Sequence, residues 1–481
     1  MNKFAIIILC ALLSPACAIG PDYKRPDVDT PVSWRVEENE AKDVADTSWW
    51  EQFHDPVLNE MVQTALKENK DLRIASARVE EFMGRYGIAR ADLFPQVGAS
   101  GFALRKGVTQ RANPPLPDTA DNPYNDYQTL LYASWEIDVW GRLRRATEAA
   151  RADLLSTEEG RRGVILTLVT AVAAGYTDLR HLDRQLEIAE QTAKNREEFF
   201  ELFKLRLERG LISDLELQQT ESEYLTALAA IPYIQKQIAQ QENSLNLLLG
   251  HNPGSISRGR NIDELVLPPV PAGIPSQLLE RRPDIRQAEQ DLIAANARIG
   301  VARALYFPTI SLTGFFGVES TDLSLLFTGP SRIWTYAVPV FMPVFTAGGI
   351  AGRVKATEAI QQQVLARYQQ TIQRAFKEVD DALVDQQKTR EQLKIQKKQV
   401  EILRNNADLA RLRYENGYTS YLEVHDADRS LFNGELAFAQ TQGTLFRALV
   451  NLYKSMGGGW VVEADKPKKL PGQDSNLQPT G

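Results

Sequence analysis

The feature that most constrains this chain is an internal duplication. Residues 87–95 read GIARADLFP and residues 300–308 read GVARALYFP, an offset of 300 − 87 = 213 positions. The block ATEA at 146–149 recurs 210 positions later, and the block GLISDLE, which begins at Gly210, recurs as GYTSYLE 207 positions later. Because three blocks keep their order at a nearly constant spacing, we infer that the chain contains two copies of one structural unit.

Composition excludes several classes of function. The 481 residues carry a net charge of −7, which argues against nucleic acid as the main partner. The four histidines, at positions 54, 181, 251 and 425, show no metal-ligand spacing and have no partner cysteines for a zinc site. We therefore expect no enzyme active site, no cofactor and no structural metal.

The N-terminus carries an export signal. Lys3 precedes an apolar stretch at 4–13 that is too short to span a membrane. The sequence LLSPAC, ending at Cys17, resembles a lipoprotein cleavage site, at which the cysteine becomes the acylated first residue. Ordinary signal peptidase could instead recognise the small residues Ala16 and Ala18. We expect a signal peptide at 1–16 and a lipid-anchored tether that starts at Cys17.

Beyond the two Phe-Pro pairs, at 94–95 and 307–308, the apolar period changes from helical to two. We expect strand pairs at about 97–138 and 310–343, with strands of about ten residues, the length that a tilted strand needs to cross a bilayer. Four strands cannot close a barrel, and each unpaired backbone group at an edge in lipid costs several kcal/mol. In a membrane the chain must therefore combine its strands with those of other copies. A soluble antiparallel sheet packed on helices would show the same periodicity.

Each strand pair is followed by a long helical pattern and a second helix with apolar residues at every seventh position. The long helices are expected at about 141–209 and 352–416, and at 1.5 Å per residue each reaches roughly 100 Å. The heptad positions are Leu217, Tyr224, Ile231, Ile238 and Leu245 in the first repeat, and Val424, Leu431, Phe438, Leu445 and Leu452 in the second. Heptads that follow a short turn indicate two antiparallel coiled-coil hairpins.

The expected layout follows the duplication. It comprises a signal peptide (1–16), a tether (17–55), a first repeat (56–250), a linker (251–275), a second repeat (276–457) and a polar tail (458–481). Each repeat contains a helix, a strand pair, a long helix and a hairpin helix, the last at 213–249 and 420–456. The tail is polar and contains prolines, so we expect it to be disordered.

Four motifs together resemble the TolC-like outer-membrane efflux proteins, in the lipoprotein branch typified by OprM and NodT. They are GPDY at 20–23, LLERRPDI at 278–285, the two Phe-Pro strand entries, and GGGW at 457–460. The resemblance implies a mixed fold, in which a homotrimer builds a twelve-stranded β-barrel in outer-membrane lipid. An all-α coiled-coil tube of twelve helices continues the barrel into the periplasm.

The resemblance also implies a function. Such a protein is the lipid-anchored outer-membrane channel of a tripartite efflux system, and it contacts a periplasmic adaptor (membrane fusion) protein and an inner-membrane pump of the RND or ABC type. Type I protein secretion uses the same architecture. A non-conducting periplasmic scaffold of long coiled coils is the alternative from another class.

Two sets of residues near the two turns match the family's periplasmic gate. Acids matching Glu423 and Asp426 ring the closed aperture in the family, and a cation or a proton would relieve their repulsion, about 1 kcal/mol for a pair at about 4 Å even in water. Tyr414 and Glu216 match a tyrosine and an acid that form a hydrogen bond between neighbouring coils. A solvated acidic helix face would explain Glu423 and Asp426 equally well.

Apolar and aromatic residues at the hairpin tips indicate a docking surface, because turns do not require them. These residues are Leu211, Ile212, Tyr418 and Tyr421, and Thr419 lies among them at a position where relatives carry a charge. We expect the periplasmic adaptor to bind there.

Overall fold

The computed structural model describes residues 18–31, 33–35, 48–109, 111, 121–268, 270, 275–457 and 461. The expected signal peptide, Cys17 and the expected tail, apart from Val461, lie outside the described residues. The chain folds into two compact units. One consists of Met1–Asp27, Arg78–Thr157 and Ala288–Tyr368, and the other of Val28–Ala77, Glu158–Gln287 and Gln369–Gly481.

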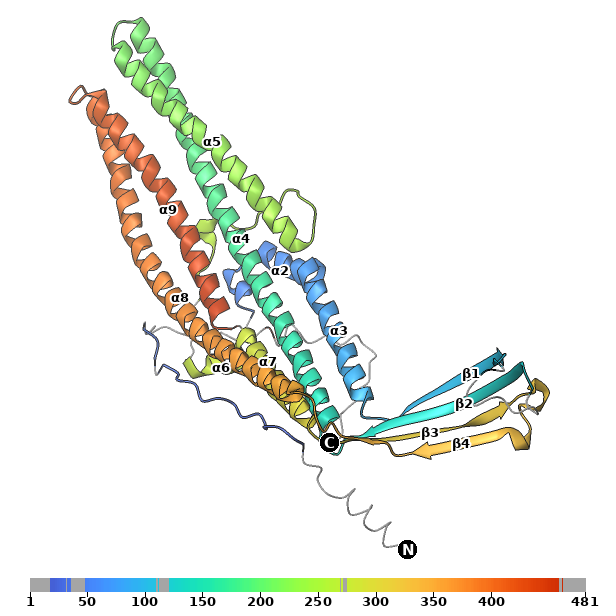
Figure 1. The fold of residues 1–481 in the computed structure, drawn as a ribbon. Helices are drawn as coiled ribbons and strands as arrows, with labels where there is room; N and C mark the ends of the chain where they lie inside the picture. Colours follow the sequence, from blue (N-terminus) through green and yellow to red (C-terminus); the bar gives the residue numbers. More distant parts are fainter. Residues whose placement is uncertain are drawn as a thin grey trace. The chain divides into compact units, whose positions relative to one another are not determined.

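The first unit contains one antiparallel sheet (Figure 1). Its strands are β1 (Gln96–Lys106), β2 (Tyr124–Ile137), β3 (Thr309–Ser320), β4 (Arg332–Ala337) and β5 (Val340–Phe341), in the order β1-β2-β3-β4, with β5 also paired to β3. Strands therefore lie in all the period-two segments, and β2 pairs with β3 across the two repeats. Pro339 separates β4 from β5, because proline has no N–H to donate to the ladder.

The register gives the sheet one strongly apolar face. Leu131 on β2 lies opposite Ala99 on β1 and Phe316 on β3, and Phe316 lies opposite Trp334 on β4. Trp334 in turn stacks on Tyr336 with ring centroids 5.8 Å apart. These side chains are exposed, so none of the residues that the structure describes covers the centre of this face.

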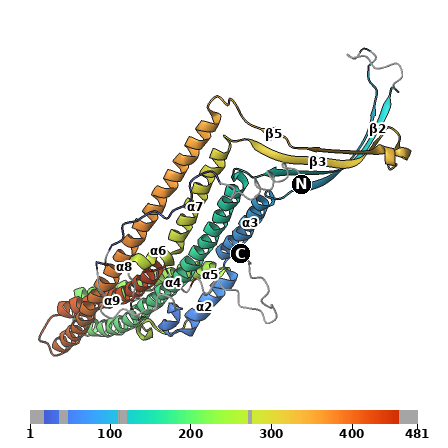
Figure 2. The same cartoon turned by 90° about the horizontal axis from the view of Figure 1, so that it is seen from below.

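Helices of both units are shown in Figure 2. They are α2 (Pro56–Glu68), α3 (Lys70–Ala91), α4 (Arg142–Glu208), α5 (Asp214–Leu249), α6 (Leu278–Arg281), α7 (Pro283–Ala304), α8 (Gly349–Glu415) and α9 (Tyr421–Ser455), with short 3-10 turns at Trp49–Phe53, Ile262–Glu264, Pro275–Gln277, Leu323–Leu325 and Gly329–Ser331. The pairs α4–α5 and α8–α9 form the two hairpins. Among the described helices, α4 alone contains an 18-residue stretch apolar enough to cross a membrane, and 56% of that stretch is buried in the chain.

The core of the second unit includes residues that the sequence placed in an extended tether. Trp49 stacks on Tyr453 of α9 at a centroid distance of 4.9 Å, and Phe53 contacts Phe446 at 5.7 Å. Both Trp49 and Phe53 are fully buried. The tether was expected to extend to residue 55, and this is wrong for its last residues. The short aromatic turn at 49–53 joins the core, and it shows no helical or strand period in the sequence.

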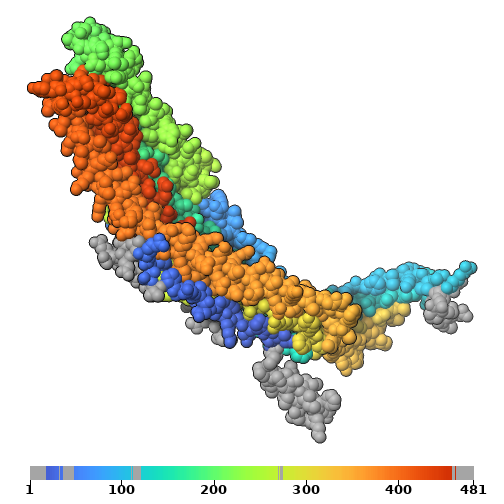
Figure 3. Space-filling model, turned by 60° about the vertical axis from the view of Figure 1, so that its left-hand side comes forward, coloured from blue at the N-terminus to red at the C-terminus, as the bar shows by residue number. Residues whose placement is uncertain are grey.

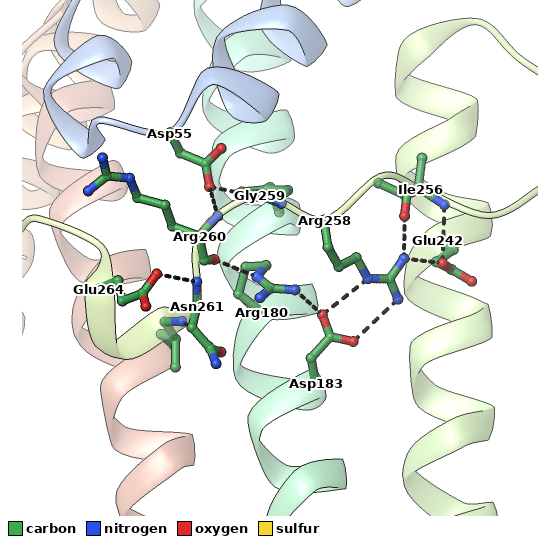
Figure 4. Close-up of polar contacts among 12 residues, drawn as sticks. Asp55, Arg180, Asp183, Glu242, Ile256, Arg258, Gly259, Arg260, Asn261 and Glu264 are labelled. Atoms are coloured by element: carbon green, nitrogen blue, oxygen red, sulfur yellow. Dashed lines mark hydrogen bonds and ion pairs between the residues drawn. The ribbon is translucent and has the colours of Figure 1, made fainter.

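Asp55 connects this turn to α2, α4 and the segment that follows α5 (Figure 4). One carboxylate oxygen accepts from the Val57 amide at 2.9 Å and caps α2. The other accepts from the Tyr176 hydroxyl at 2.7 Å and from the Arg260 amide at 2.9 Å. Gly259 passes so close that a Cβ there would overlap the carboxylate. The fully buried charge is thus satisfied by donors from three elements of the same unit.

A second set of ion pairs fixes the segment expected as a linker, after residue 250. Arg258 reaches Asp183 of α4 at 3.2 Å and also pairs with Glu242 of α5 (Figure 4). Asp183 is shared with Arg180, at 2.5 Å, and Arg180 donates to the Arg260 carbonyl at 2.8 Å. The described part of this segment is therefore held against the helices by directional, charge-assisted bonds.

Candidate functional site

The two hairpin turns are built alike. Gly210 and Gly417 end α4 and α8 with φ angles of +70° and +75°, the left-handed conformation that glycine adopts without strain. The amide of Leu211 bonds the Arg206 carbonyl at 2.9 Å, and the amide of Tyr418 bonds the Arg413 carbonyl at 2.9 Å. Each turn therefore closes its long helix with backbone bonds and projects the next side chain outward.

An aromatic cluster lies directly behind the turns. Phe203 of α4 packs on Tyr421 of α9 with centroids 4.6 Å apart, and Tyr414 of α8 lies 5.5 Å from Tyr421 and 6.0 Å from Phe203. Val424 of α9 is buried in the same cluster. The cluster joins the two hairpins of one chain near their tips.

The expected tip residues differ in exposure. Leu211 and Tyr418 are 70% and 77% exposed, and Ile212 and Thr419 are partly exposed. Tyr421 is only 5% exposed, so its expected place on an exposed docking surface is wrong. Its ring fills the gap between the hairpins, a role that its position after the Ser420 helix cap does not reveal.

The two acids expected at the gate, Glu423 and Asp426, are exposed and paired with arginines of their own chain. Glu423 lies 3.2 Å from Arg413 of α8, and Asp426 lies 2.8 Å from Arg429 one turn further along α9. Both pairs are open to solvent, so they contribute little stability and can be exchanged for other ions. The acids share one side of α9, away from the buried Val424.

Tyr414 and Glu216 lie in one neighbourhood but have other partners among the described residues. Glu216 accepts from the Ser213 amide at 2.8 Å and from its hydroxyl at 3.0 Å, which forms a capping box at the start of α5. Tyr414 instead contacts Arg206 of α4, whose guanidinium lies over its ring, 5.9 Å from the ring centroid. Burial raises the pKa of Tyr414.

Tyr414→Phe is expected to raise channel conductance two- to fivefold, because it removes the hydroxyl that would donate the latch bond between neighbouring coils, worth about 1 kcal/mol, while the ring stack remains. Conductance in planar bilayers measures the effect. Tyr233→Phe serves as the control, because Tyr233 is exposed on α5 away from the turns. Equal conductance of the Tyr414→Phe and wild-type proteins would contradict a latch at this position.

Sequence reasoning missed a group of buried charges behind the aromatic cluster. Arg196 of α4 pairs with Glu223 of α5 at 2.7 Å, and Arg411 of α8 pairs with Asp428 of α9 at 2.9 Å. Burial lowers the pKa of Arg196 and raises that of Asp428. A signal for the first pair existed in the sequence, because Arg196 lies 14 residues before Gly210 and Glu223 lies 13 after it, which places opposite charges side by side on antiparallel arms.

Among the residues that the structure describes, no group of three or more His, Cys, Asp or Glu side chains could hold a metal ion. A cation at Glu423 and Asp426 would therefore need acids from more than one chain.

The chain matches one family model twice. The model is that of the outer membrane efflux protein, and the matches cover residues 61–251 and 274–458. These two segments contain the two hairpins and the four main strands described above.

Individual relatives match over nearly the whole chain. The toluene efflux pump outer membrane protein TtgC of Pseudomonas putida is 35% identical over 94% of this chain and 95% of its own length. The "Probable outer membrane lipoprotein SilC" of Salmonella typhimurium is 33% identical over 95% of this chain and 99% of its own length. A crystal structure of CusC is 35% identical, with a TM-score of 0.82 over 92% of this chain and all of that one. These matches confirm the resemblance inferred from the four motifs, and the chain belongs to the outer membrane efflux protein family.

Proposed function

We propose that this chain is the outer-membrane duct of a tripartite efflux system and works as a homotrimer. Its family consists of efflux channels of the outer membrane, and the protein is such a channel. The observation that carries the finer proposal is the sheet, which has an uncovered apolar face and two unpaired edges.

The sheet requires other copies of the chain if it lies in lipid. Among the described residues, β1 pairs only with β2, and β4 pairs only with β3. Each free edge would leave backbone groups without partners in a bilayer, at several kcal/mol per group. Three copies of four main strands give 3 × 4 = 12 strands, which can close into a barrel with no free edge.

The long helices support the same assembly. Ile395, Ile402 and Leu409 recur every seven residues along α8, and all three are more than half exposed in the chain. Figure 3 shows α8 as a long orange surface. A second heptad stripe that the hairpin itself does not bury is suited to a neighbouring coil. In the trimer, α4, α5, α8 and α9 of each copy would give 3 × 4 = 12 helices, which would form the periplasmic tube. The family model matches the chain twice, which supports the internal duplication that supplies two hairpins per copy.

The N-terminal segment supports a lipid anchor at Cys17. The Ile19 amide donates to the Trp140 carbonyl, just beyond β2, at 3.0 Å, and Asn296 of α7 donates to the Pro21 carbonyl at 2.8 Å. Gly20 approaches Gly300 so closely that a Cβ on Gly20 would overlap that backbone. The segment that follows Cys17 is thus tied to the end of a strand, where acyl chains on Cys17 could enter the adjacent leaflet. The name of the relative SilC supports this proposal.

The hairpin tips are proposed to dock the adaptor of an RND-type or ABC-type pump. Leu211 and Tyr418 project from the two turns of each chain, and Ile212 and Thr419 flank them. Glu423 and Asp426, three copies of each, would ring the aperture, and a divalent cation could replace Arg413 and Arg429 as their partner. A type I protein secretion channel would use the same parts.

Cysteine at position 418 is expected to crosslink to the periplasmic adaptor, because Tyr418 is the most exposed aromatic residue at the tips. A photoactivatable, thiol-reactive crosslinker is attached to this cysteine in cells. Illumination, followed by immunoblotting for the adaptor, measures the adduct. Cysteine at exposed position 247, near the far end of α5, is the matched control. Adducts from 247 but none from 418 would place docking elsewhere.

Carbonate extraction tests the proposal against the scaffold. A barrel protein stays in the membrane pellet at alkaline pH, whereas a peripheral coiled-coil scaffold is released. Release of the Cys17→Ser protein together with the wild type would contradict a membrane-spanning barrel. Retention of both would show that the barrel itself holds the protein in lipid.

A further inference from the structure

One close polar contact joins the two hairpins just behind the aromatic cluster. His425 of α9 places its Nε2 2.9 Å from Oε1 of Glu223 on α5. The two side chains are 16% and 11% exposed, so water competes weakly for this bond. The ion pairs of Arg196 and Arg411, by contrast, each stay within one hairpin.

The surroundings fix the geometry of this contact. The second carboxylate oxygen of Glu223 lies 2.7 Å from Arg196, and Arg196 also donates to the Glu223 carbonyl at 2.7 Å. Glu223 is therefore held in place within hairpin α4–α5, independently of its contact with His425. The polar groups around His425 are Asn195 and Arg196 from α4, Thr220 and Glu223 from α5, Arg411 from α8, and Tyr421, Asp426 and Asp428 from α9.

His425 also adjoins the gate acids. Its Nδ1 lies 3.7 Å from Oδ1 of Asp426, and Glu423 lies two residues before it on α9. The 2.9 Å contact with Glu223 thus restricts the rotation and the height of the α9 segment that carries both acids. The aromatic contacts between the hairpins fix these less sharply, because stacked rings tolerate sliding.

We propose that His425 is a positioning residue of the periplasmic gate, which ties the acid-bearing segment of α9 to hairpin α4–α5 through Glu223. This inference rests on the proposed channel function. The role belongs to the hydrogen bond itself, so a neutral donor of similar reach can replace the imidazole.

The test is single-channel recording in planar bilayers with three variants. His425→Leu is expected to raise the open probability about tenfold, since it removes the bond between the hairpins and fills the same space. His425→Gln is expected to stay within twofold of wild type, because its amide can donate to Glu223. His251→Leu, at an exposed position beyond α5, is the control and should match wild type.

A double variant keeps the inference testable if His425→Leu destabilises the protein. Glu223→Cys with His425→Cys, bridged by the short thiol crosslinker dibromobimane, should restore the low open probability, and a monofunctional maleimide should not. Background labelling is small, because the sequence has cysteines only at positions 10 and 17. Size-exclusion chromatography confirms that each recorded sample is the intact trimer.

The outcomes separate the two proposals. Conducting channels whose gating is unchanged by His425→Leu, or changed equally by His425→Leu and His425→Gln, would overturn the role of His425 alone. A wild-type trimer that never conducts would overturn the channel and the role of His425 with it.

Discussion

Asp55→Ala is expected to destabilise the helical unit by about 3–5 kcal/mol. The substitution leaves the buried Tyr176 hydroxyl and the Arg260 amide without an acceptor, and each unsatisfied buried donor costs about 1–3 kcal/mol. It also removes the cap of α2, worth about 1 kcal/mol. Urea unfolding of the detergent-purified protein, followed by its helical circular dichroism, measures the change.

Two variants control this result. Asp55→Asn keeps one oxygen for the α2 cap and loses acceptor capacity at the other atom, so about half of the destabilisation is expected. Glu51→Ala changes an exposed acid of the same turn and should have an effect below about 0.5 kcal/mol. An Asp55→Ala protein that unfolds within 1 kcal/mol of wild type would contradict the assigned network.

Leu131→Arg is expected to abolish the assembled trimer, whereas Leu130→Arg should be tolerated. The two residues are neighbours at the middle of β2 and point to opposite faces of the sheet. Leu131 lies on the apolar face with Phe316 and Trp334, and arginine at the bilayer midplane costs about 2–4 kcal/mol in each chain. Arginine at 130 would face the water-filled bore of the proposed barrel.

The amount of outer-membrane trimer on mild gels measures both variants. Equal loss of trimer in Leu130→Arg and Leu131→Arg would show that the sheet packs on protein at both faces, as in a soluble domain. Equal tolerance of both would show that neither face contacts lipid.

The sequence predicted best where a period repeats many times. The hairpins follow from five apolar residues at seven-residue spacing in each repeat. The strands follow from the alternation of apolar and polar residues in the segments that contain Ile310 and Leu131. Each of these periods can be recognised within one segment alone. The glycine turns at 210 and 417 were predictable for the same reason, because their geometry depends on one residue.

Contacts that depend on the choice between several partners could not be predicted in this way. Glu216 bonds Ser213, which caps α5, rather than Tyr414. Bringing together two residues that are three positions apart costs little conformational entropy. Tyr421 faces inward because the two hairpins meet there, and the sequence of one segment alone does not show where hairpins meet. The buried turn at 49–53 is too short to show a period, although its two tryptophans and a phenylalanine were visible as apolar residues before Asp55.

The most direct test of the account is single-channel conductance of the purified protein in a planar bilayer, recorded on a sample shown by light scattering to be a trimer. The account predicts steady conductance that falls when a divalent cation is added, and that no longer falls in a Glu423→Gln, Asp426→Asn double variant. A trimer without conductance in either form, with or without cation, would contradict an export channel built from these strands.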